Sequence, residues 1–126
     1  MKLAGAMLFV KDFVRMRDFY GSMLGVKPVN TEWTDRWALF DIGGAEFALH
    51  AIPQEYARSI QLSSPPKPSE QNPVKLIFWV EDVPAERARL EAMGVPMLQR
   101  EWQNPCESCD AVDPEGNVFQ IAANGR

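Results

Sequence analysis

The sequence predicts an α+β fold in a single domain, residues 1–126, built from two tandem βαβββ modules. Two near-repeats carry this prediction. Residues 41–49, D-I-G-G-A-E-F-A-L, align without a gap with residues 113–121, D-P-E-G-N-V-F-Q-I. An apolar run, an Asp and a helical pattern also occur twice, ending at Gly25 and at Gly94. Such self-similarity over nearly the whole chain indicates an internal duplication.

The first module is predicted to span residues 1–52. Residues 3–10 form an apolar run of strand length, and Asp12 is a good N-cap for the helix that follows. Apolar side chains recur at helical spacing up to Gly25, which supplies the stop. Three strands are then expected, at residues 26–30, 36–42 and 45–52, with Gly43-Gly44 as the tight turn between the last two.

A linker and a second module are predicted to follow. Residues 53–73 include S-S-P-P-K-P-S, and proline at this density disfavours a regular helix or a central strand. The second module, residues 74–123, repeats the pattern with a strand at 74–80, a cap at Asp82, a helix at 83–93 and a stop at Gly94. Further strands are expected at 95–99, around Ala111-Val112 and at 118–122.

The composition restricts the class of protein. With 46% hydrophobic and 24% charged residues, the chain has the make-up of a globular protein. Its net charge of −4 and the lack of a Lys/Arg cluster argue against nucleic acid as a partner. The N-terminal apolar run is broken by Lys11 and Asp12, so it reads as a buried strand and neither as a signal peptide nor as a membrane segment. A cytoplasmic location is the default expectation, and two cysteines agree with it.

Three motifs together resemble the vicinal oxygen chelate superfamily, which includes glyoxalase I, bleomycin resistance proteins, fosfomycin resistance enzymes and extradiol dioxygenases. They are V-K-D-F…F-Y…L-G-V at residues 10–26, V-E-D-V…L…G-V at 80–95, and D-P-E-G-N at 113–117. The resemblance implies two half-barrels that form a cup, commonly completed in a homodimer. It also implies, in members with a metal, one ligand on the first and one on the last strand of each module.

The four corresponding positions here are Gly5, Ala48, Lys75 and Gln120. Gly and Ala have no donor atom, and a protonated Lys has no lone pair. A neutral amide oxygen alone is a weak ligand for a transition metal. We therefore expect no catalytic metal and no cofactor.

A relocated metal site is improbable. Glu46 and His50 are predicted on the same strand face as Ala48, but each is displaced along the strand by roughly 6.6 Å. Metal–ligand bonds are only about 2.0–2.2 Å long, so a donor displaced this far lies outside the coordination shell of the metal.

The predicted cup is mostly apolar with a few polar groups, which is typical of a small-molecule pocket. Its expected ligand-binding residues are Met7, Phe9, Glu46, His50, Lys75, Ile77, Trp79 and Gln120. Ala48, Val118 and Ala122 are expected on the same face, and Trp33, Trp37 and Trp102 at its rim.

Each polar or aromatic candidate also has a plainer interpretation. His50 is more simply a strand-end residue than a base. Lys75 could reach out to solvent or pair with Glu46 as readily as it could bind an anionic ligand. Gln120 could serve neighbouring backbone or water, and Phe9 and Trp79 could fill the cup as ordinary packing.

The C-x-x-C of Cys106 and Cys109 could serve redox chemistry or half of a zinc site. The sequence offers no second pair of ligands for a structural zinc, and thioredoxin-like use needs a helix start in another fold. We expect two loop thiols.

These observations favour a metal-independent small-molecule-binding protein of the glyoxalase and bleomycin resistance type, which sequesters an apolar or aromatic ligand that is neutral or anionic. The first alternative is a lyase- or isomerase-type enzyme that uses Glu46, His50 or Lys75 for acid–base chemistry. The second is a non-catalytic dimeric scaffold.

Overall fold

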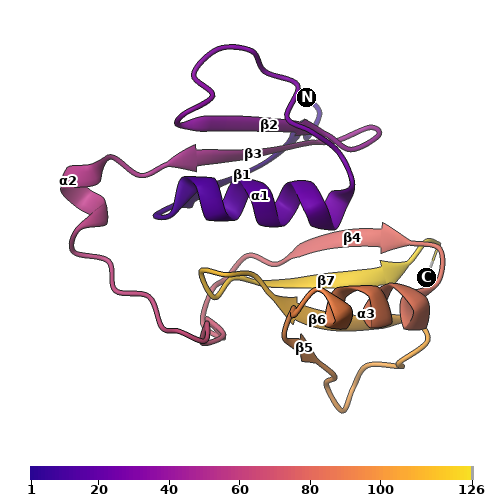
Figure 1. The fold of residues 1–126 in the computed structure, drawn as a ribbon. Coiled ribbons are helices and arrows are strands. Elements are labelled where there is room, and N and C mark those ends of the chain that lie inside the picture. Colours follow the sequence, from indigo (N-terminus) through magenta and orange to yellow (C-terminus); the bar gives the residue numbers. More distant parts are fainter. Residues whose placement is uncertain (126) are drawn as a thin grey trace. The chain divides into compact units, whose positions relative to one another are not determined.

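The computed structural model describes residues 1–125, which fall into two compact units (Figure 1). Unit 1 is Met1–Gln61, and unit 2 begins at Leu62. The boundary lies within the predicted linker, residues 53–73. The predicted mixed fold is confirmed, because each unit contains a β-sheet and at least one helix. The cup between the modules and the homodimer stay predictions.

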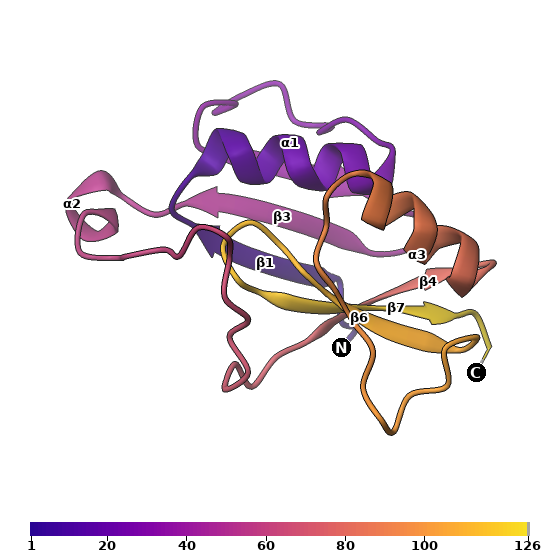
Figure 2. The same cartoon turned by 60° about the horizontal axis from the view of Figure 1, so that its bottom comes forward.

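Unit 1 contains a three-stranded sheet and two helices. In chain order these are β1 (Gly5–Val10), α1 (Phe13–Leu24), β2 (Trp37–Asp41), β3 (Glu46–Ala51) and α2 (Gln54–Ala57). The strand order is β1-β3-β2, with β1 parallel and β2 antiparallel to β3. Helix α1 lies along the sheet (Figure 2), and the Tyr20 ring packs edge-on against Phe47 at 4.8 Å. The buried core of unit 1 therefore lies between α1 and one face of this sheet.

The signals that bound α1 act as predicted. The Asp12 side chain accepts a hydrogen bond from the backbone N–H of Arg15, which satisfies one free amide of the first turn. Gly25 ends the helix in the left-handed conformation, φ 70°, and its N–H donates to the carbonyl of Gly21. Both ends of α1 therefore lie where the sequence predicts them.

The strand predicted at residues 26–30 does not form. This segment lies beside β2 instead, where the N–H of Val29 donates to the Leu39 carbonyl at 2.8 Å. The side-chain amide of Asn30 donates to the Trp37 carbonyl and accepts from the Leu39 N–H. Pro28 has no N–H to donate to a ladder, and Asn30 uses its side chain where a strand would use its backbone.

One short helix occurs where a linker without a helix was expected. Helix α2 is a single turn that starts directly after Pro53. Proline is compatible with a helix start because the first amides of a helix have no partner inside it. The prolines at 65, 66 and 68 lie beyond it, in a segment without helix or strand.

Unit 2 contains a four-stranded sheet and one helix. Its elements are β4 (Leu76–Val80), α3 (Val83–Ala92), β5 (Met97–Leu98), β6 (Ser108–Val112) and β7 (Val118–Ala123). The strand order is β4-β7-β6-β5, with β4 parallel to β7 and the other pairs antiparallel. Asp82 caps α3 as predicted, through the N–H of Ala85 at 2.9 Å. The strand expected at 95–99 is shorter than predicted.

The D-P-E-G-N turn is held by hydrogen bonds within the turn and by one from the proline-rich segment. Asp113 is fully buried and accepts hydrogen bonds from the N–H groups of Glu115 and Asn117 and from the Asn117 side chain. Gly116 has φ 87°, and its carbonyl accepts from the N–H of Ser69 at 2.9 Å. The proline-rich segment is thus attached to this turn of unit 2. None of the described helices is long and apolar enough to cross a membrane.

Candidate functional site

The helix-free face of each sheet carries the residues that were predicted to bind a ligand. In unit 1, β1 pairs with β3 so that Phe9 lies beside His50 and Met7 beside Ala48. On the other side of β3, Trp37 lies beside His50, and Leu39 beside Ala48. Two rows of side chains therefore cross the unit 1 sheet, one of them formed by Phe9, His50 and Trp37.

The imidazole of His50 lies between two aromatic rings. Its centroid is 5.3 Å from that of Phe9 and 5.9 Å from that of Trp37, the latter edge-on at 74°. His50 Nδ1 is 2.9 Å from the carbonyl oxygen of Ala51. A carbonyl only accepts, so Nδ1 carries the hydrogen and the neutral ring has its lone pair on Nε2. Trp37, predicted only at the rim, is thus part of this row.

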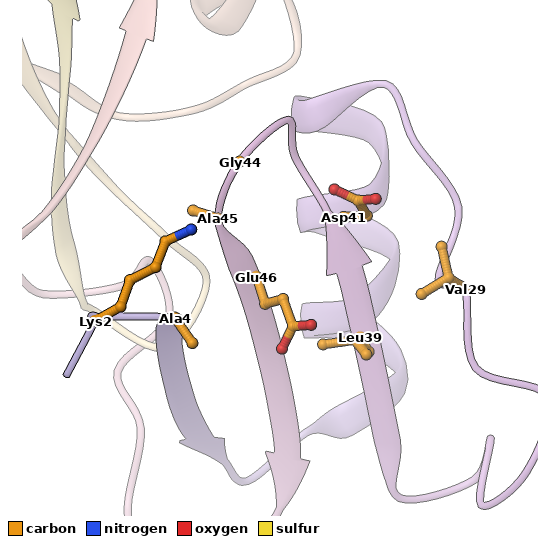
Figure 3. Close-up of a pocket in the computed structure, with 8 residues that line it drawn as sticks. All are labelled: Lys2, Ala4, Val29, Leu39, Asp41, Gly44, Ala45 and Glu46. Atoms are coloured by element: carbon orange, nitrogen blue, oxygen red, sulfur yellow. The ribbon is translucent and has the colours of Figure 1, made fainter.

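Glu46 lies at the other end of β3 from His50. Four residues along a strand correspond to about 13 Å, so the two side chains share no point for proton transfer. Glu46 instead pairs in register with Asp41, and both border a pocket of about 370 Å³ (Figure 3). The remaining residues of this pocket are Lys2, Ala4, Val29, Leu39, Gly44 and Ala45.

In unit 2, Lys75 pairs with Asp110 and not with Glu46. The Lys75 ammonium lies 2.8 Å from Asp110 Oδ2, and the Asp110 carboxylate is fully buried. The same oxygen accepts from Arg100 Nε at 3.1 Å. The second oxygen, Oδ1, accepts from the side-chain amides of Gln103 at 2.9 Å and Gln120 at 3.3 Å. Lys75 and Gln120, which occupy two of the four positions that correspond to metal ligands, are therefore hydrogen-bonded to Asp110.

These contacts set the ionisation of Asp110. Burial by itself would raise the pKa of the carboxyl group, because it penalises the charged form. The hydrogen bonds from Lys75, Gln103, Arg100 and Gln120 outweigh it and hold the pKa of Asp110 below its usual range. Arg100 also binds Glu70 at 2.9 Å, so the chain of ion pairs continues to the segment before β4.

Sequence reasoning missed Asp110. The signal was available, because an Asp within the otherwise apolar or small-residue strand Ser108–Val112 is a charge at a position expected to be buried. A buried carboxylate needs charged or polar partners. The sequence alone did not say which residues supply them.

Ile77 and Trp79 lie on β4, on the same face as Gln120. Ile77 pairs in register with Gln120, and Trp79 with Ala122. Trp79 is 67% exposed and Phe9 of unit 1 is 62% exposed. Whether these two rings bind a ligand or pack as ordinary core residues stays a prediction. Trp33 and Trp102 are also exposed, both in loops.

The positions that correspond to metal ligands do not fit a metal. A Cβ atom added at Gly5 would lie 2.0 Å from the carbonyl oxygen of Glu46, so β1 leaves no room there for any side chain. Ala48 is buried and has no donor, and Lys75 is an ion-paired cation. Within residues 1–125, no three His, Cys, Asp or Glu side chains are grouped so that they could hold a metal ion.

The two cysteines differ. Cys106 is exposed in a loop, as expected, but Cys109 is buried in β6, so the expectation of two loop thiols is wrong for Cys109. Burial raises the pKa of the Cys109 thiol, chiefly because the thiolate would lose its hydration. Neither cysteine forms a disulfide in the structure.

Solved structures with a similar fold cover nearly the whole chain. Lactoylglutathione lyase from Agrobacterium tumefaciens matches with a TM-score of 0.70 at 22% identity, covering 98% of this chain and 93% of that one. The fosfomycin resistance protein FosX from Listeria monocytogenes, complexed with Mn(II) and sulfate, matches with a TM-score of 0.70 at 17% identity, covering 97% and 89%. Glyoxalase I from Leishmania major matches at 0.66 and 20%, covering 98% and 86%.

At these identities the structural matches show the fold alone. No curated protein matches the sequence. The family model described as a glyoxalase-like domain matches residues 6–122. The chain therefore belongs to the family of glyoxalase-like domains, within the vicinal oxygen chelate superfamily.

Proposed function

We propose that this chain is a metal-independent small-molecule-binding protein of the glyoxalase and bleomycin resistance type, with an apolar or aromatic ligand that is neutral or anionic. The observation that carries this proposal is the close approach of the Glu46 backbone to Gly5. A Cβ atom added at Gly5 would lie 2.0 Å from the Glu46 carbonyl oxygen. A side chain that could bind a metal from the first strand has no space, whatever its chemistry.

The second module supports the same proposal. The Lys75 ammonium is held at 2.8 Å by the buried Asp110 carboxylate, and Gln120 donates to that carboxylate as well. Asp110 thereby balances the charge of Lys75, so a ligand here meets an ion pair and not an isolated cation. FosX, which has a similar fold, is known in complex with Mn(II). The donor set of this chain does not match such chemistry.

The exposed rings supply the binding surface. Met7 and Phe9 of β1, and Ile77 and Trp79 of β4, are all exposed on the faces that the helices leave open. Such side chains favour apolar or aromatic ligands.

We further propose a homodimer in the cytoplasm, where the two thiols of Cys106 and Cys109 stay reduced.

The acid–base enzyme receives less support. Glu46 and His50 are about 13 Å apart along β3, and Lys75 is engaged by Asp110. Glu46 and His50 share unit 1 but are too far apart to act as acid and base on the same reacting atom. Lys75 lies in unit 2, which contains neither of them.

Native mass spectrometry of the purified protein, combined with elemental analysis, tests the proposal. We expect a dimer without stoichiometric metal and with a co-purifying organic mass. Stoichiometric Zn, Ni, Fe or Mn would overturn metal independence. If a ligand is identified, Trp79→Ala should weaken its binding, and unchanged binding would contradict the proposed binding surface.

A further inference from the structure

The row formed by Phe9, His50 and Trp37 presents one hydrogen-bond acceptor between two aromatic rings. The three residues come from β1, β3 and β2, which are adjacent strands of one sheet. His50 Nδ1 donates to the Ala51 carbonyl, so Nε2 of the neutral ring can only accept. Each aromatic centroid lies within 6 Å of the imidazole centroid.

The acceptor on Nε2 is open to a ligand. Within the described part of the chain, no residue hydrogen-bonds to this atom, and no buried side-chain nitrogen or oxygen lacks a partner. Nε2 is therefore reached by solvent. The neighbouring row along the strands, Met7, Ala48 and Leu39, is apolar. A ligand on this surface thus meets aromatic and aliphatic groups, and one polar atom that can be satisfied only by a donor.

We infer that the ligand is a neutral, planar aromatic molecule with an O–H or N–H group, which packs against Phe9 and Trp37 and donates a hydrogen bond to His50 Nε2. The inference rests on the proposed function and names its ligand class. The two rows contain no Lys or Arg side chain, so an anion would find no cation in them. A purely apolar ring would bury Nε2 without a partner, which costs binding free energy.

Isothermal titration with two probes tests this. 1-Naphthol has a donor hydroxyl group, and 1-methoxynaphthalene has a similar shape without one. We expect 1-naphthol to bind the unchanged protein about fivefold to tenfold more tightly than the ether, the difference made by one hydrogen bond. This comparison needs no variant and so does not depend on the folding of one.

Variants then assign the site. His50→Phe keeps a ring but removes the acceptor, so we expect both probes to bind it with equal affinity. Trp37→Leu should weaken both probes by about threefold to tenfold, because it removes an aromatic contact. Tyr56→Ala, which removes an exposed ring on α2, is the matched control and should change neither affinity.

The outcomes separate this inference from the proposed function. Equal affinity of the two probes for the unchanged protein, a preference that survives in His50→Phe, or no binding of either probe would each overturn the inference. A metal-free protein with a co-purifying organic mass would still support small-molecule binding in any of these cases. Stoichiometric metal would overturn the proposed function independently of the probes.

Discussion

The carboxylate of Asp110, fully buried in β6, holds the ammonium nitrogen of Lys75 at 2.8 Å. Its other donors are Arg100, Gln103 and Gln120. Lys75 directly precedes β4, Arg100 and Gln103 follow β5, and Gln120 lies on β7. One carboxylate thus connects parts of unit 2 that are far apart in sequence.

Asp110→Ala should destabilise the protein. The substitution leaves two amides and two cations without their shared acceptor, and we expect the free energy of unfolding to fall by about 2–3 kcal/mol. Urea denaturation followed by circular dichroism measures the change. Glu101→Ala, which removes an exposed carboxylate of the same unit, is the control and should stay within about 0.5 kcal/mol. If Asp110→Ala lowered the free energy of unfolding by no more than this control does, the hydrogen bonds and ion pairs of Asp110 would contribute little to stability.

Asp110 should also make stability depend on pH in the acidic range. Its pKa is lower in the folded protein than the usual unfolded value of about 3.9, so its contribution is fully present above that value. The contribution is lost as the pH falls through the folded pKa. We expect the free energy of unfolding to drop more between about pH 5 and pH 2.5 in the unchanged protein than in Asp110→Asn. Equal drops in urea titrations at these two values would contradict the expectation.

Much of the fold could be predicted from the sequence because its signals are local. Asp12 and Asp82 act on amides three residues away, and Gly25 acts on the turn before it. The segment at residues 26–30 was misassigned because Asn30 reaches nine residues ahead, to Leu39, through its side chain. A propensity for strand does not reveal that a side chain replaces the backbone ladder.

The candidate site was predictable only in part, for the same physical reason. The resemblance to the superfamily identified Gly5, Ala48, Lys75 and Gln120, because these positions follow from the motifs by sequence offsets alone. Lys75 and Asp110 are 35 residues apart, and their pairing depends on how β4 and β6 both lie against β7. Nothing local connects them. The lack of space for a side chain at Gly5 likewise depends on the register between β1 and β3, which places Gly5 beside Glu46.

Gly116 and Gly44, equivalent positions in the internal repeat, should respond differently to alanine. Both have positive φ, 87° and 98°, so alanine is strained at each by about 1–2 kcal/mol. At Gly116 the new Cβ would also lie 2.5 Å from the Lys67 carbonyl oxygen, whereas at Gly44 it meets nothing within 4 Å. We expect Gly116→Ala to lower the free energy of unfolding by about 3 kcal/mol and Gly44→Ala by about 1 kcal/mol, measured in urea. Equal losses would show that the proline-rich segment moves aside freely.

Gly5 and Gly21 should respond differently to alanine. A Cβ at Gly5 would overlap the Glu46 carbonyl oxygen at 2.0 Å, so β1 and β3 must separate, and we expect a loss of about 2–3 kcal/mol in the free energy of unfolding. Gly21 is inside α1, where the nearest atom to a new Cβ is 3.4 Å away. Alanine there should be neutral or stabilise by up to about 1 kcal/mol, because it is the better helix former.

Urea denaturation of both variants decides whether the Gly5 position is closed. If Gly5→Ala were as stable as the unchanged protein, β1 would have room for a side chain. A metal ligand introduced at that position would then be feasible, and the principal support for metal independence would be lost. A large loss at Gly5 beside none at Gly21 would instead mean that the approach of β1 to β3 excludes such a ligand.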